Sequence, residues 1–226
     1  MRKSKFIVLW ILISSLSACA NFPRIYSGKS VHGWVIDAKT KQPIKDVVIV
    51  EIWELYGHDS ILQMEGDING YVHIAETLTD KNGYYEFSDW GPKFTMNGRM
   101  DKWSPQLIFY KFGYDDVRHQ NHVSGNLHPD NTVSEHSGEK VVLARNEGSP
   151  KEYEKAIGSL DDVLRLWSYR KGFECQWVNV PRFAAELIKL SNFFRENRVN
   201  NSFPRLTSFP EKKCGDRDQM LKDYLK

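Results

Sequence analysis

The distribution of apolar residues predicts a series of short β-strands over the first two thirds of the chain. Residues 30–37 are β-branched and aromatic, and the polar residues 38–43 that follow end in proline, which is typical of a strand and a turn. Residues 44–55 form a nearly continuous apolar run, which indicates a strand covered on most of both faces. Further strands are expected over residues 71–79, 84–88, 107–110 and 140–144. Five to seven strands separated by turn residues favour a β-sandwich.

Two of these segments predict a tight hairpin. In residues 71–79, Val72, Ile74 and Leu78 alternate with the residues between them, so we expect the three on one face. The strand then enters Asp80-Lys81-Asn82-Gly83, where Asn-Gly supplies the positive φ that such turns require. We therefore expect residues 84–88 to form the returning strand.

Beyond residue 144 the period changes to that of a helix. Ser149, Pro150 and Glu152 match an N-cap, a proline in the first helical position and a capping-box glutamate. An apolar stripe follows at helical spacing and ends at Lys171-Gly172. Its residues are Tyr153, Ala156, Ile157, Leu160, Val163, Leu164 and Trp167.

A second helix is expected from Asn179 or Pro181 to about Asn197, and a short last helix over residues 216–226. The inner face of the second helix is predicted to carry Phe183, Leu187, Leu190, Ser191 and Phe194. The two apolar stripes suit packing on the sandwich or on each other better than a membrane or partner face. The predicted fold is thus mainly β, with an antiparallel sandwich followed by a C-terminal helical hairpin.

The N-terminus has the order of a secretory signal. Arg2, Lys3 and Lys5 precede the apolar residues 6–13, which are too few for the ~20 needed to span a bilayer. Leu16-Ser17-Ala18-Cys19 then resembles the lipobox of bacterial lipoproteins, in which signal peptidase II cuts before a cysteine whose sulfur carries a diacylglycerol. The resemblance implies a signal peptide over residues 1–18, a lipid anchor at Cys19 and a tether over residues 19–28.

This resemblance also sets the expected location. The next residue is Ala20 rather than the aspartate that retains lipoproteins in the inner membrane of enteric bacteria, which favours the outer membrane, facing the periplasm or the surface. Two or three acyl chains would hold a soluble domain durably at a bilayer. The expected partner is therefore the membrane, through the N-terminal lipid, together with an envelope protein or glycan.

Charge argues against a nucleic-acid partner. The chain has 31 basic and 29 acidic residues, and without residues 1–18 it has 28 basic and 29 acidic ones. A phosphate-binding protein needs a basic surplus on one face. No nucleic acid is therefore expected.

The lipobox resemblance also determines how the other two cysteines are expected to pair. If Cys19 carries lipid, Cys175 and Cys214 are the remaining pair, and an oxidising compartment would join them in a disulfide. A metal site or catalytic thiol has less support, because neither has a nearby histidine or a Cys-x-x-Cys partner.

Several short motifs in the strand region resemble the carboxypeptidase regulatory-like family. Residues 33–37 (Gly-Trp-Val-Ile-Asp) resemble its G-x-V-x-D, Pro43-Ile44 its P-I turn, and residues 79–87 its T-D-x-x-G-x-Y-x-F. Residues 107–114 resemble its closing strand and G-Y turn. The resemblance implies a transthyretin-like (prealbumin-like) β-sandwich over residues 29–145, with a helical appendage over residues 149–226.

Two long polar segments, residues 57–70 and 118–138, are where binding would be expected on such a sandwich. The second carries four of the seven histidines, and His119 and His122 are weak candidates for a metal. Zinc enzymes usually need three protein ligands, so no metal or cofactor is assigned. An iron site like that of intradiol dioxygenases is not expected either, because their close His-x-His motif after a tyrosine is missing.

No catalytic residue is assigned, because the chain lacks a nucleophile elbow, a phosphate-binding loop and a dinucleotide fingerprint. The expected function is a non-enzymatic binding or scaffold module for protein, peptide or glycan, anchored at the envelope. The alternative is a loop-centred metal-dependent enzyme that uses histidines of residues 119–136.

Overall fold

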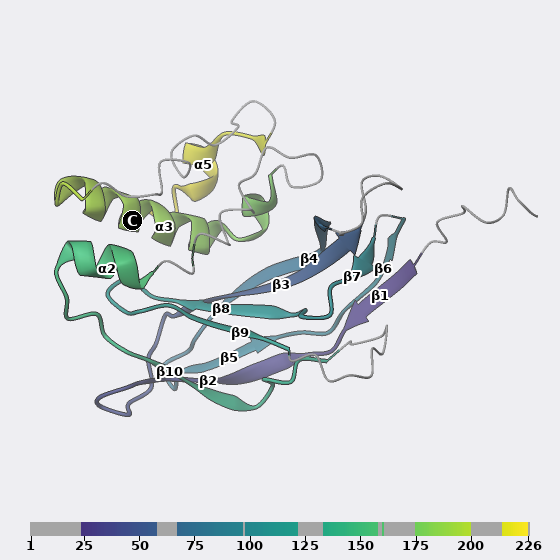
Figure 1. The fold of residues 1–226 in the computed structure, drawn as a ribbon, viewed down its shortest axis with the longest axis horizontal. Helices are drawn as coiled ribbons and strands as arrows, with labels where there is room; N and C mark the ends of the chain where they lie inside the picture. The colour runs from purple at the N-terminus through teal and green to yellow at the C-terminus, as the bar shows by residue number, and fades with distance from the viewer. Residues whose placement is uncertain are drawn as a thin grey trace, which may run out of the picture.

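The described part of the chain forms two β-sheets packed face to face, a separate two-stranded sheet at one end, and a set of helices on the outer face of the largest sheet (Figure 1). The computed structural model describes seven parts of the chain, so Cys19, the lipobox and His122 lie outside them. These parts are residues 24–57, 67–96, 98–121, 133–157, 160, 175–199 and 214–225. The predicted class, a mainly β sandwich followed by C-terminal helices, is confirmed.

The smaller sheet has three strands, in the spatial order β10 (Glu139–Leu143), β2 (Val31–Asp37) and β5 (Tyr84–Phe87). β2 and β5 are antiparallel, whereas β10 runs parallel to β2 with Glu139 opposite Gly33. The expected antiparallel sandwich therefore contains one parallel pair. Parallel neighbours need a long connection between them. The chain between β2 and β10 provides one, because it includes all the described strands of the larger sheet.

The larger sheet is antiparallel throughout its described strands. Four of them lie in the order β4 (Asp67–Leu78), β3 (Val48–Gly57), β8 (Gln106–Tyr110) and β9 (Val117–Gln120), and the short β7 (Arg99–Met100) also pairs with β3. β4 and β9 extend into the two segments that were expected to be loops. The strand predicted over residues 71–79 is thus the later part of β4, whereas its first residues and β9 were missed because polar residues interrupt any apolar run there.

β3 lies at the centre of the molecule, and residues 48–55 are buried. Val48 and Val50 face the helices, while Ile49 faces the smaller sheet. This two-sided burial explains the continuous apolar run in the sequence. The core between the sheets is completed by Val35, Tyr85, Phe87, Leu107, Phe109, Val141 and Leu143.

The β4–β3 pairing contains a bulge that changes which residues share a face. Trp53 pairs with His73 and Glu54 with Tyr71, which leaves Val72 as the extra residue. Val72 therefore packs with Trp53, whereas Ile74 and Leu78 pack towards the helices. The expected common face of these three residues is wrong because simple alternation cannot indicate a bulge.

The predicted turn before β5 is confirmed. Asp80 accepts the backbone N–H groups of Asn82 and Tyr84 at 2.8 and 2.9 Å, and Gly83 has a φ of +71°. A β-carbon on Gly83 would collide with the carbonyl oxygen of Val35, so both conformation and space require glycine here.

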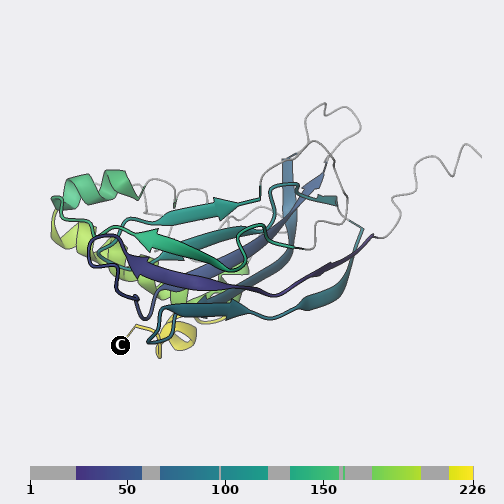
Figure 2. The ribbon, with the colours of Figure 1, turned by 90° about the horizontal axis from the view of Figure 1, so that it is seen from below.

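At the other end of the sandwich, β1 (Arg24–Gly28) pairs antiparallel with β6 (Trp90–Thr95). Tyr26 and Trp90 are buried against Trp53, whose ring centroid lies 5.2 Å from that of Trp90. Residues 24–28, the last part of the tether expected over residues 19–28, thus form a strand, and Tyr26 anchors it in this aromatic cluster. Figure 2 shows the two strands reaching away from the helical end.

The C-terminal helices are α2 (Pro150–Ala156), the 3₁₀ helix η3 (Gln176–Asn179), α3 (Pro181–Glu196) and α5 (Arg217–Leu221). The capping box at Ser149 and Glu152 is formed. α2 ends before the predicted Lys171, and residues 161–174 lie outside the described chain. Within the described residues, no helix combines the length and apolarity needed to cross a membrane.

α3 covers the outer face of the larger sheet. Its predicted inner residues Phe183, Leu187, Leu190, Ser191 and Phe194 are all buried. Four of these, with Trp177 of η3, form one cluster with residues of β3 and β8. The apolar stripe of α3 thus serves packing on the sandwich, as expected.

Candidate functional site

Of the sequence-predicted site residues, the structure places Cys175, Cys214 and His119. Cys175 and Cys214 are joined by a disulfide, with their Cα atoms 5.2 Å apart. The bond links the residue before η3 to the C-terminal segment that carries α5. The expected pairing is confirmed, and it gives these cysteines a structural role.

His119 lies on β9 close to His136, which belongs to the histidines of the alternative metal hypothesis, and to Glu139, which that hypothesis did not include. Its Nδ1 atom is 3.8 Å from the Glu139 carboxylate on β10, and Nδ1 of His136 is 2.9 Å from the same oxygen. The two imidazole centroids are 4.6 Å apart. We call His119, His136 and Glu139 the histidine cluster; one ligand atom from each lies within 4.8 Å of the others.

The two imidazoles differ in their electrostatic surroundings. Burial, with a smaller contribution from His136, lowers the pKa of His119. Burial also acts to lower the pKa of His136, but the Gln120 carbonyl and the Glu139 carboxylate outweigh it and raise that pKa above its ordinary value. At neutral pH His119 is therefore a neutral imidazole beside a carboxylate and a more basic histidine.

A second pair of titratable groups lies nearby in the core. Glu51 of β3 is fully buried, and its carboxylate is 3.6 Å from Nε2 of His73 on β4. Burial raises the pKa of Glu51 to about 7, opposed in part by the Trp53 indole, and burial lowers the pKa of His73 to about 4. Between these values both groups are mainly neutral, so the contact is not an ion pair in that range.

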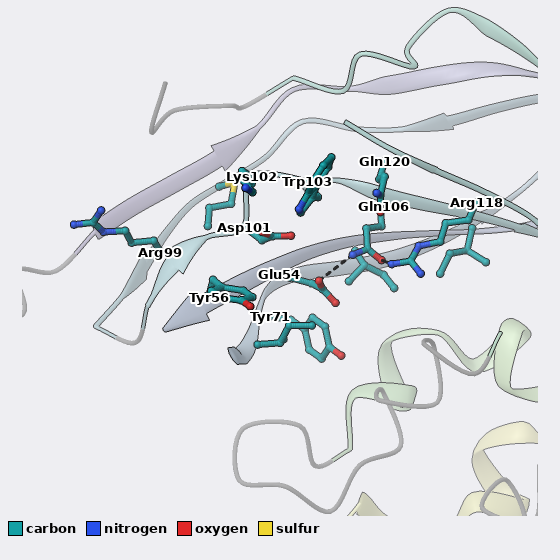
Figure 3. Close-up of a pocket in the computed structure, with 14 residues that line it drawn as sticks. Glu54, Tyr56, Tyr71, Arg99, Asp101, Lys102, Trp103, Gln106, Arg118 and Gln120 are labelled. Carbon is teal, nitrogen blue, oxygen red and sulfur yellow. Dashed lines mark hydrogen bonds between the residues drawn. The ribbon is translucent and has the colours of Figure 1, made fainter. Parts of the chain in front are cut away.

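The larger sheet also carries a pocket of about 680 Å³ on its outer face, beyond the part that the helices cover. Ile52 and Ile108 belong both to the pocket and to the helix-covered core. We call this the sheet pocket. Its polar and aromatic lining residues include Glu54, Tyr56, Tyr71, Trp103, Gln106 and Arg118 (Figure 3).

Three planar polar side chains form a connected row along the floor of the sheet pocket. Arg118 donates to the amide oxygen of Gln106 at 2.7 Å, and the amide nitrogen of Gln106 donates to Glu54 at 2.9 Å. Figure 3 shows the row with Trp103 and Tyr71 on opposite sides of it. Each hydrogen bond fixes the orientation of the next group, so the floor is preorganised.

The loop before β8 holds Trp103 in place at the rim. The backbone of Glu54 makes two hydrogen bonds to this loop. The Glu54 N–H donates to Ser104 Oγ at 2.9 Å, and the Glu54 carbonyl accepts the Asp101 N–H at 2.8 Å. Asn121 is fully buried and donates from its backbone N–H to the Trp103 carbonyl at 3.2 Å. The exposed fractions of Trp103 and Tyr56 are 36% and 44%, so two aromatic rings remain accessible.

β9 connects the sheet pocket with the histidine cluster. Arg118 and Gln120 line the pocket on one face of this strand, whereas His119 points to the other face and lies against Phe109 in the sandwich. Because neighbouring side chains on a strand point to opposite faces, the four residues of β9 contribute to two candidate sites on opposite faces of the sheet.

Sequence reasoning missed Glu139 and the sheet pocket. Glu139 reaches the histidines only through the parallel pairing of β10 with β2, which has no local signal. The pocket residues are contributed by five strands and one loop. On β9, the polar residues Arg118 and Gln120 stand two positions apart, and this spacing on a strand was the available signal.

No protein-family model matches the chain, and no curated protein matches it. Solved structures with similar folds include 3-chlorocatechol 1,2-dioxygenase from Rhodococcus opacus 1CP, with a TM-score of 0.31, 16% identity and coverage of 54% of this chain and 62% of that chain. Another is the group B streptococcus pilus 2b backbone protein, with a TM-score of 0.28, 13% identity and coverage of 53% and 42%. The chain spans less than two thirds of the length of each.

Proposed function

We propose that this chain is a lipid-anchored protein of the bacterial cell envelope whose transthyretin-like, carboxypeptidase regulatory-like sandwich binds a glycan in the sheet pocket without catalysing a reaction. The observation that carries the binding proposal is the combination of exposed aromatic rings with the row formed by Glu54, Gln106 and Arg118.

Sugars have two kinds of surface, and the sheet pocket offers a partner for each. The C–H faces of a pyranose ring are apolar and stack on aromatic rings such as Trp103 and Tyr56. The hydroxyl groups at the ring edge both donate and accept hydrogen bonds, which suits carboxylate, amide and guanidinium groups in fixed positions. A pocket of about 680 Å³ lies within the usual range for small-molecule sites.

The charges of the pocket favour a polar, uncharged ligand over a strongly charged one. Arg99, Lys102 and Arg118 are balanced in part by Glu54 and Asp101. Burial raises the pKa of Asp101 above its ordinary value, opposed in part by backbone hydrogen bonds and by Lys102. A glycan of the envelope meets these requirements, and the proposed anchor at Cys19 would keep the pocket within reach of it.

The binding test uses the full chain in detergent and a tetramer of N-acetylglucosamine as probe, followed by calorimetry. We expect binding that Trp103→Ala weakens at least about tenfold, corresponding to about 1.4 kcal/mol. Trp34→Ala is the matched control, because Trp34 lies on the smaller sheet away from the pocket, and it should bind as the unmodified chain does. Equal affinity of all three proteins contradicts the assignment, and cleavage of the probe contradicts a non-enzymatic role.

The anchor is tested separately, by counting reactive thiols in the chain made with its N-terminus intact. Lipid on Cys19 and the Cys175–Cys214 bond together leave no reactive thiol under denaturing conditions and two after reduction. One thiol before reduction and three after it would show that Cys19 carries no lipid. This outcome would leave the glycan measurement unaffected.

A further inference from the structure

We propose that the histidine cluster binds one zinc ion, with His119, His136 and Glu139 as its protein ligands, and that the ion links the two sheets of the sandwich. The site is independent of the sheet pocket. It lies on the opposite face of β9 and draws its donors from β9, from the turn before β10 and from β10 itself.

The donor types and their spacing suit this ion. Zinc takes imidazole nitrogen and carboxylate oxygen at about 2.0–2.2 Å, which places tetrahedral ligands about 3.3 Å apart. The Glu139 oxygen lies 2.9 Å from His136 Nδ1 and 3.8 Å from His119 Nδ1, on either side of that value. One ligand atom of each residue lies within 4.8 Å of the other two, so side-chain adjustments that shorten the longer separations would bring all three atoms onto one ion.

His136 is held in the orientation that a metal ligand needs. Its Nε2 atom lies 3.0 Å from the carbonyl oxygen of Gln120, and because a carbonyl can only accept, this nitrogen carries the hydrogen. Nδ1 is then the nitrogen directed at Glu139. A ring whose distal N–H is bound to a backbone carbonyl is the usual arrangement of histidine ligands in metal sites.

The turn that carries His136 is anchored independently. The side chain of buried Asn121 accepts the Glu135 N–H at 2.9 Å and donates to the Val133 carbonyl at 3.0 Å. The His136 N–H lies 3.2 Å from Ser134 Oγ. These contacts fix the turn, so little ordering is needed when an ion binds.

His119 supplies the second observation. Within the described chain, its Nδ1 atom is buried and has no hydrogen-bond partner, an arrangement that costs free energy unless another group satisfies it. An ion between His119 and Glu139 would satisfy it. The Glu139 side chain is 47% exposed, which gives an ion access to the cluster and leaves room for water as a fourth ligand.

The test measures zinc binding to the full chain in detergent, by calorimetry and by the shift of the thermal unfolding midpoint. We expect one zinc ion per chain and a higher midpoint in its presence. His119→Gln, His136→Gln and Glu139→Gln should each weaken binding at least tenfold and remove the shift. Because Glu139 is half exposed, its variant is expected to fold even if a histidine variant does not.

Two further variants separate this site from other histidines. His32→Gln removes a histidine that contacts Ser137 rather than the cluster, and it should bind zinc as the unmodified chain does. The double variant His122→Gln/His128→Gln should also retain binding. Absence of stoichiometric binding, unchanged binding in all three cluster variants, or loss confined to the double variant would each overturn the proposal.

Discussion

The carboxylate of Glu76 on β4 accepts the backbone N–H of Phe183 at 2.9 Å, across 107 residues of sequence. It also accepts the Arg182 N–H at 2.9 Å. α3 has no capping side chain of its own at Val180, so the sheet supplies the acceptor for the first turn of the helix. This contact fixes the helix to the strand at its N-terminal end.

We expect Glu76→Gln to lower the free energy of unfolding by about 1–3 kcal/mol, because the amide offers only one acceptor oxygen and leaves an N–H unsatisfied. Urea unfolding measures the change. Glu86→Gln is the control, since Glu86 is exposed and contacts the Tyr84 hydroxyl instead. If both variants lose the same free energy of unfolding, the contact between Glu76 and α3 contributes nothing to stability.

Removing the disulfide with Cys175→Ser/Cys214→Ser should destabilise the chain by about 4 kcal/mol, because the bond closes a span of 39 residues. The reduced, unmodified chain should show the same loss in urea unfolding. If the double variant is as stable as the oxidised chain, the bond does not constrain the unfolded state as proposed.

Glu51 should make the stability of the protein depend on pH. The native state holds the Glu51 proton up to about pH 7, whereas the unfolded chain releases it near 4.5, so the free energy of unfolding decreases as pH rises from 4.5 to 7. Glu51→Gln removes this decrease, and at pH 8 the variant should be more stable by about 3 kcal/mol.

His73 acts in the opposite direction. Its pKa is lowered to about 4, so stability is lost as pH falls from 6.5 towards 4, when the unfolded chain takes up a proton that the native state lacks. Subtracting the free energy of unfolding of the unmodified chain from that of Glu51→Gln at each pH gives the contribution of the Glu51 carboxyl group alone. A constant difference from pH 4.5 to 8 would contradict the raised pKa.

The two adjacent tyrosines of β5 should respond differently to loss of the hydroxyl. Among the described residues the buried Tyr85 hydroxyl has no hydrogen-bond partner, so we expect Tyr85→Phe to raise the free energy of unfolding by about 1 kcal/mol. Tyr84 is more exposed and donates to Glu86 at 3.0 Å, so Tyr84→Phe should be neutral or slightly destabilising. Unfolding in EDTA checks both variants, and a marked loss for Tyr85→Phe would reveal a partner.

Elements with local sequence signals were predicted well. The strand of residues 31–37, the turn at Gly83 and the inner face of α3 follow from alternation, turn chemistry and helical spacing. β1 and β6 were missed because their stability comes from Trp53, Tyr26 and Trp90, which meet only in the folded molecule. The candidate sites were missed for the same reason, because Glu139 and the pocket residues come together only through pairing between strands that are distant in the sequence.

The parallel pairing of β2 with β10 also bears on how the chain folds. Val35 pairs with Val141, a contact between residues more than one hundred positions apart, so one edge of β2 stays open until almost the entire sandwich sequence is present. Such long-range closure slows folding and exposes an unsatisfied strand edge in the meantime. A chain that stops before residue 139 cannot complete the smaller sheet, which makes β10 the closing strand of the sandwich.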